Sequence, residues 1–273
     1  MHLKTTFTAF ALLAATGLAQ AVPLPAGWTC NGNCGEFFAP DGDVTLPPGL
    51  SAYGWISTEG GLNGVGTLPT GALGSETNGS FAQTPPFSAS AGDQLVWYFN
   101  YLTTDGGIFK DYAWAALLDS TNTVVSYLFT ARTTPSGNTV PGSGLPALGA
   151  GVTLTPATSA VIATGPLFSP LGPDSGGCWD PAACGYTDWI KMDYTFSSAG
   201  NYFLAFGVTN VGDDFINTAL AFNGTLNGKP FLAPSPSSVP EPASTALFGL
   251  GLAGLAALRR QRGRKALKNP AQF

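Results

Sequence analysis

Residues 91–102 read AGDQLVWYFNYL, and two later segments, 112–118 (YAWAALL) and 202–208 (YFLAFGV), have the same character. Almost every position after the first few is apolar, and aromatic side chains are frequent. Short apolar runs of this kind are typical of central β-strands that are covered on both faces. We therefore expect these three segments to build the core of an all-β domain.

Residues 190–196 (IKMDYTF) alternate between apolar and polar side chains, which predicts a strand with one wet face. Further short strands are expected at residues 44–46, 53–57, 123–130, 152–154, 161–163 and 218–222. Gly, Asn and Asp mark turns between them, as at residues 105–107 and 136–138. About ten strands at hairpin spacing favour an antiparallel β-sandwich over residues 22–232, without an internal linker.

The order of these segments resembles the jelly-roll sandwiches of galactose-binding and carbohydrate-binding modules. That resemblance implies a jelly-roll-like connection of the strands. It also implies extracellular polysaccharide as a possible partner.

The charges of this sequence are segregated along the chain. Between residues 22 and 258, four cations face sixteen carboxylates, which is a net charge of −12. A nucleic-acid partner is not expected, because phosphate binding needs clustered Lys and Arg. The Gly-rich stretch at residues 60–66 lacks the Lys-Ser/Thr of a phosphate loop, so nucleotide binding is not expected either.

Residues 1–21 have the layout of a secretory signal peptide. Lys4 precedes an apolar stretch from residue 7 to 18, and Ala19-Gln20-Ala21 fits the small-x-small cleavage rule. We expect export, with a mature chain that starts near Val22.

The opposite end of the sequence has three parts. Residues 233–242 are a linker rich in Pro and Ser that ends in Val239, Pro240, Glu241 and Pro242, residues 243–258 are mostly apolar, and residues 259–273 form a basic tail. Sixteen helical residues span about 24 Å, slightly less than a hydrocarbon core of about 30 Å. The arginines of the tail place it on the cytoplasmic side by the positive-inside rule. The sequence predicts a short transmembrane helix that holds the chain in the inner membrane transiently.

These C-terminal residues closely resemble the PEP-CTERM sorting signal. The resemblance implies a partner, an exosortase-type membrane processing enzyme that cleaves near the motif. Segments of the body, such as WTCNGNCG (28–35), CGYTDW (184–189) and FGVTN (206–210), resemble a group of PEP-CTERM proteins with no assigned activity. The expected location is the cell envelope, the cell surface or the extracellular matrix of a Gram-negative bacterium.

The mature sequence contains few residues of the kinds that catalytic sites use. The single histidine, His2, belongs to the signal peptide, which excludes Ser-His-Asp and Cys-His catalysis and His-ligated metal sites from the mature chain. We expect a structural or binding module and no enzyme.

The four cysteines form two close pairs, Cys30 with Cys34 and Cys178 with Cys184. In an exported chain an even number of cysteines favours disulfides. Three pairings are possible, and the two local ones are preferred because each closes a short loop. A zinc site with four thiolate ligands is the alternative, although the spacing of the second pair does not match it.

Carboxylates in the predicted loops are interpreted mainly as solvated turn residues. No cofactor is required, but calcium is possible at Asp213 and Asp214, which are adjacent after a core strand. A carbohydrate-active enzyme that uses two loop aspartates is the alternative from another class. A glycan-binding module is the intermediate case, and the loop with Trp179 and Trp189 is its preferred recognition surface.

Overall fold

The computed structural model describes residues 21–232. Strands account for 44% of the structure and helix for 3%, which confirms the all-β prediction. The expected signal peptide, apart from Ala21, lies outside the described residues, as do the linker, the hydrophobic helix and the basic tail. Within residues 21–232, no helix is long and apolar enough to span a bilayer.

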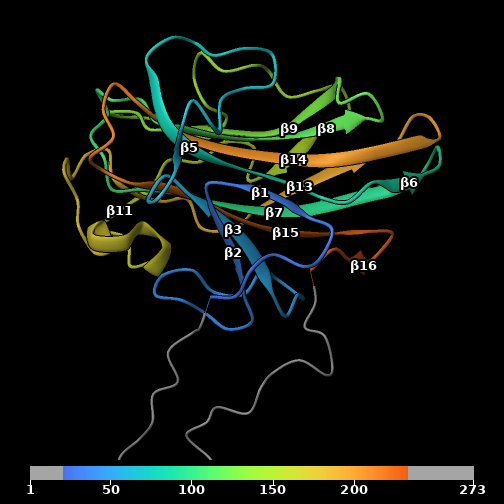
Figure 1. Ribbon diagram of the computed structural model, residues 1–273, viewed down its shortest axis with the longest axis horizontal. Coiled ribbons are helices and arrows are strands. Elements are labelled where there is room, and N and C mark those ends of the chain that lie inside the picture. Colours follow the sequence, from blue (N-terminus) through green and yellow to red (C-terminus); the bar gives the residue numbers. More distant parts are fainter. Residues whose placement is uncertain (1–20, 233–273) are drawn as a thin grey trace, which may run out of the picture. The chain divides into compact units, whose positions relative to one another are not determined.

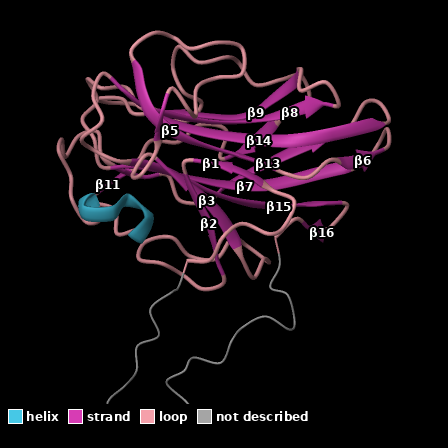
Figure 2. Cartoon of the chain, viewed as in Figure 1, coloured by secondary structure: helices cyan, strands magenta, loops and turns pink. Residues whose placement is uncertain are grey.

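Two antiparallel sheets form a sandwich (Figure 1), and the strands dominate the cartoon in Figure 2. The seven-stranded sheet has the order β1-β5-β14-β8-β9, with β4 beside β5 and β6 beside β14. Its strands are β1 (Thr29–Asn31), β4 (Leu62–Asn63), β5 (Glu76–Gln83), β6 (Phe87–Ala89), β8 (Tyr112–Asp119), β9 (Val124–Arg132) and β14 (Gly200–Val211).

The nine-stranded sheet has the order β10-β13-β7-β15-β3-β2. Off this path, β12 pairs with β7 and β11, and β16 pairs with β15. Its strands are β2 (Asn33–Phe37), β3 (Tyr53–Ser57), β7 (Gln94–Thr103), β10 (Thr153–Thr155), β11 (Ile162–Ala163), β12 (Gly185–Tyr186), β13 (Ile190–Thr195), β15 (Thr218–Leu226) and β16 (Lys229–Pro230). The 3₁₀ helix η1 (Ser169–Asp174) lies beside this sheet.

Stacked aromatic rings join the two sheets. Phe206 of β14 and Phe222 of β15 are nearly parallel, with ring centroids 4.1 Å apart. Trp97 of β7 lies 5.1 Å from Phe206, and Phe99 lies 4.6 Å from Phe129 of β9. Aromatic pairs of this geometry stabilise a core beyond their burial alone.

Smaller apolar clusters cover the outer faces of the sheets. One contains Tyr53 and Leu102 of the nine-stranded sheet together with Phe168 and Leu171 beside or within η1. Another contains Trp114 on the seven-stranded sheet. Residues 112–118 are buried on both faces as expected, whereas residues 95–102 and 202–208 are buried except for the half-buried side chains of Val96, Tyr98 and Phe203.

Several strands differ from the sequence-based expectations. The strand β5 was not predicted, because ETNGSFAQ is mostly polar and does not alternate. The expected strand at residues 44–46 is only an isolated bridge between Asp41 and Val44.

Candidate binding surface

One end of the sandwich gathers three long loops. Thr103 at the end of β7 pairs with Thr218 at the start of β15, so the loop after β7 and the loop before β15 meet there. The backbone amide of Thr104 donates to the carbonyl of Asn217 over 3.1 Å, which ties the two loops together. We call this region, residues 104–111, 175–184 and 212–217, the loop end.

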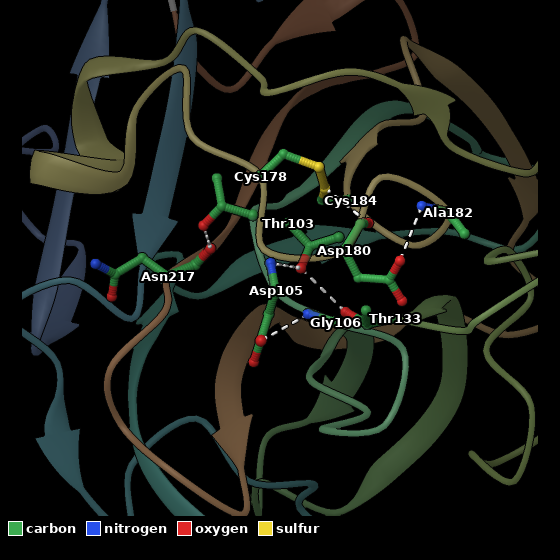
Figure 3. Close-up of a disulfide and its surroundings, with 10 residues drawn as sticks. Thr103, Asp105, Gly106, Thr133, Cys178, Asp180, Ala182, Cys184 and Asn217 are labelled. Atoms are coloured by element: carbon green, nitrogen blue, oxygen red, sulfur yellow. Dashed lines mark hydrogen bonds between the residues drawn. A yellow bond between two sulfur atoms is a disulfide. The ribbon is translucent and has the colours of Figure 1, made fainter.

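The second disulfide, between Cys178 and Cys184, belongs to the loop end (Figure 3). The amide of Trp179 donates to the carbonyl of Thr104 over 2.9 Å, and the backbone of Asp180 accepts from the amide of Cys184 over 3.0 Å. Both predicted local pairings are present, because Cys30 and Cys34 form the first disulfide.

Large apolar side chains are exposed on these loops. Ile108 is 77% exposed, Trp179 is 68% exposed and Phe215 is 79% exposed. They come from three different loops of one end, which is where a sandwich domain usually presents a recognition surface. Trp189, the other tryptophan of the expected surface, is half-buried instead, because it packs against Tyr53 and donates its Nε1–H to the carbonyl of Thr45.

Carboxylates lie beneath these loops, and they do not match the expectation of solvated turn residues. Asp105 and Asp111 are fully buried. Burial, together with the nearby charge of Asp213, raises the pKa of Asp105 to about 6. Burial and the charge of Asp105 raise the pKa of Asp111 well above its ordinary range. Asp111 was missed by sequence reasoning; its only signal is its position directly before an apolar strand.

The two carboxylates expected to hold calcium have different surroundings. Asp213 is half-buried and is one of the charges that act on Asp105 and Asp111, whereas Asp214 is exposed. Across residues 21–232, no group of three or more His, Cys, Asp or Glu side chains is placed to hold a metal ion. Calcium at Asp213 and Asp214 therefore remains a prediction.

Asn217 joins two further carboxylates at the edge of the loop end. Its side-chain amide donates to Glu59 Oε2 over 2.9 Å and to Asp174 Oδ2 over 2.8 Å. Burial raises the pKa of Asp174. The amide thus bridges two acids that would otherwise repel each other.

The opposite end of the sandwich carries an open groove of about 390 Å³. It is near Leu226, which pairs with Leu95 at the other end of β7 and β15. Trp28 lines the groove, and its ring lies nearly parallel to those of Phe206 and Phe222, with centroids 6.1 Å away in each case. The other lining residues are Pro25, Ala26, Pro85, Pro86, Phe87, Leu226, Lys229, Pro230 and Phe231. We call this region the aromatic groove.

The clearest match to a known family falls in the sequence that follows the sandwich. The family model for the PEP-CTERM protein-sorting motif matches residues 238–261, which include Val239, Pro240, Glu241 and Pro242. The chain carries a PEP-CTERM sorting motif. This motif implies processing by an exosortase membrane enzyme and indicates export to the cell envelope or surface.

Two solved structures are similar to this chain at 12% sequence identity. One is the K1 cleaved adhesin domain of Lys-gingipain from Porphyromonas gingivalis W83, with 78% of this chain and all of that chain covered and a TM-score of 0.35. The other is the K3 cleaved adhesin domain of the same protein, with 74% and 92% covered and a TM-score of 0.30. No curated protein matches the chain.

Proposed function

We propose that this chain is a surface or extracellular-matrix protein of a Gram-negative bacterium whose β-sandwich acts as a structural or binding module. The observation that carries the proposal is the sorting motif at residues 238–261, placed directly after a compact, disulfide-bonded sandwich. We further propose a jelly-roll-like connection of the strands, in agreement with the two antiparallel sheets.

The proposal includes the absence of catalysis. In support, the only histidine is His2, and a cut near Val22 would remove it. Asp105 and Asp111, the loop-end carboxylates whose pKa values are raised by burial, are themselves fully buried. A glycosidase would instead need two acids on either side of an accessible sugar.

Glycan binding is a second candidate function, and the aromatic groove favours it. Trp28 is half-buried, with its ring stacked in parallel on two core phenylalanines. Its place in the wall of a groove of about 390 Å³ is suited to a sugar ring, since this volume falls within the usual range for small-molecule sites of roughly 300 to 1,000 Å³. Extracellular polysaccharide is the partner class that we propose for this groove.

A panel of polysaccharides tests these alternatives together. The purified protein is passed over immobilised polysaccharides, and retention and the release of reducing ends are measured in parallel. A glycan-binding module is retained without releasing ends, and a purely structural module does neither. Release of reducing ends, lost on substitution of a loop aspartate, would replace the proposal with a carbohydrate-active enzyme.

The sorting part of the proposal has its own test. Protein from the native host is expected to start near Val22 and to lack the basic tail, because the signal peptide and the segment after Pro242 are removed. Intact-mass measurement decides this. A full-length species that retains residues 259–273 would contradict processing by an exosortase.

A further inference from the structure

The loop end buries two carboxylates without a neutralising cation. Asp105 and Asp111 are both fully buried. Among residues 21–232, the one ion pair joins Lys191 and Asp193, which belong to β13. A buried carboxylate costs folding free energy unless it is protonated, paired or bound to a metal.

The hydrogen bonds around these acids leave one oxygen free. Asp111 accepts from the amide of Val211 at Oδ1 and from the hydroxyl of Thr218 at Oδ2, each over 2.8 Å. Asp105 accepts from the amide of Gly106 at Oδ1 over 2.6 Å. Its Oδ2 is buried and accepts no hydrogen bond from an N–H group or a hydroxyl of a described residue, and the nearest acid is Asp111, whose carboxyl group lies within hydrogen-bonding reach of Asp105. A buried, unpartnered carboxylate oxygen points to a missing ligand.

The surrounding atoms are mostly oxygens. The amide of Asp105 donates to the hydroxyl of Thr103 over 3.2 Å, and that hydroxyl lies 3.1 Å from each of the hydroxyls of Thr133 and Thr218. These bonds hold the two acids beside a cluster of threonine hydroxyls. Asp213 adds negative charge nearby. Oxygen ligands and negative charge are what calcium requires.

We propose that Asp105 and Asp111 form the anionic part of a calcium site beneath the loops that follow β7 and β14. No third His, Cys, Asp or Glu side chain among residues 21–232 is placed to join these two carboxylates, so the remaining ligands of the ion would be neutral oxygens from hydroxyls, backbone carbonyls and water. The site differs from the pair expected from the sequence, in which Asp214 was a ligand. Bound calcium would tie the exposed apolar loops of the binding surface to the core strands.

Thermal unfolding of the full chain at pH 7.5 tests the proposal, with calcium compared against a chelator and against magnesium at equal concentration. Calcium at one hundred times its dissociation constant is expected to raise the melting temperature by about 5 to 11 °C. Magnesium controls for ionic screening. An unchanged melting temperature in calcium would overturn the proposal and leave the two acids as a pair that shares a proton.

Substitutions locate the ion. Asp105→Asn and Asp111→Asn are each expected to remove most of the calcium response, whereas Asp214→Asn, one of the exposed acids of the same end, is the matched control and retains it. Loss of the response in the control, with the response kept in Asp105→Asn, would overturn the assignment and move the ion to the surface.

Terbium luminescence tests the site in protein that retains both aspartates, so it does not depend on whether the Asp→Asn variants fold. A Cβ added at Gly106, next to Asp105, would lie 3.0 Å from the ring of Trp179. Terbium at the calcium site should therefore be sensitised by excitation of this tryptophan, and calcium should displace it. Trp179→Phe is expected to reduce the emission severalfold while leaving the calcium-dependent melting intact. Unchanged emission in Trp179→Phe would contradict the location.

Discussion

At one end of the sandwich, carboxylates lie buried beneath loops that expose apolar side chains, whereas at the opposite end a tryptophan on stacked phenylalanines lines an open groove. The same two strands, β7 and β15, run between these ends. Thr103 and Thr218 join the polar network at the loop end, and Leu95 and Leu226 lie near the aromatic groove. The comparison shows how one pair of hydrogen-bonded strands, β7 and β15, can support two surfaces with different chemistry.

The largest expected effect concerns Trp28. Replacement by alanine removes its stacking on Phe206 and Phe222, and we expect it to lower the free energy of unfolding by about 2 to 3 kcal/mol, less than for a fully buried ring because Trp28 is half-buried. Trp179→Ala at the loop end is the matched control and should change it by less than about 0.5 kcal/mol, since that ring is mostly exposed. Urea unfolding measures both.

The same pair of variants sharpens the functional comparison. If the aromatic groove binds glycans, Trp28→Ala should lose retention on polysaccharide and Trp179→Ala should keep it. The opposite result would assign glycan recognition to the loop end. Equal losses of stability in the two variants would show that Trp28 does not contribute more to packing than Trp179, contrary to what the burial of the two rings indicates.

The disulfides should contribute next in size. Each closes a loop of a few residues, and the chain-entropy model gives about 2 kcal/mol for such a loop. We expect Cys178→Ala with Cys184→Ala to destabilise more than the corresponding change at Cys30 and Cys34, because Cys184 is fully buried and Cys30 is exposed. Urea unfolding compares the double variants.

All four cysteines are expected to be oxidised. Thiol counting on the unreduced, denatured protein should find no free thiol, and two or more reactive thiols per chain would refute the pairing.

How far the sequence predicts this structure depends on how local the signal is. Residues 95–102 carry their own evidence, since an aromatic and apolar run needs cover on both faces. The local cysteine pairs were also predictable from short spacing in an exported chain. The strand β5 was not, because Gly79 and its polar neighbours become a strand only between β1 and β14. In the same way, the burial of Asp111 arises from the packing of β14 and β15 against it.

The candidate site was predicted only in outline for the same reason. The tryptophans near the second cysteine pair were expected to form one surface, but only Trp179 is exposed, because Trp189 packs against Tyr53 from a distant strand. The groove around Trp28 combines segments about 200 residues apart in the sequence, since Phe231 also lines it. Contacts between such distant segments leave no spacing pattern in a single sequence.

The dependence of stability on pH should distinguish Asp105 at the loop end from Glu36 in β2 by the range in which it occurs. Burial raises the pKa of Glu36 to about 7, and Glu36 lies opposite Gly54 of β3, which pairs in turn with Phe222 of β15. Asp105 at the loop end has its pKa raised to about 6. Because both pKa values are raised on folding, the folded state holds these protons more tightly. Their contribution to stability is complete below about pH 4 and is lost as the pH rises through 6 and then 7.

Urea midpoints between pH 4 and 8, measured in chelator, check this. Asp105→Asn should flatten the part of the curve near pH 6, and Glu36→Gln should flatten the part near pH 7. Each variant should be more stable than the wild type at pH 8 because it removes a buried charge. A wild-type stability that rises from pH 5 to 8 would contradict the raised pKa values of both Asp105 and Glu36.

The smallest effect on stability is expected for Phe215. Its ring is 79% exposed, so Phe215→Ser removes little apolar area from the folded protein, and the backbone amide of this residue can still donate to Asp213 Oδ1 over 3.2 Å. The free energy of unfolding should change by less than about 0.5 kcal/mol.

A large exposed ring without a role in packing is most simply explained by contact with a partner. We therefore expect Phe215→Ser to weaken binding of any partner that docks on the loop end, while retention at the aromatic groove is unchanged. Retention and urea unfolding, measured on the same preparation as Trp28→Ala, separate the two ends. A loss of stability above about 1 kcal/mol would show that Phe215 packs against the sandwich and is not part of an open surface.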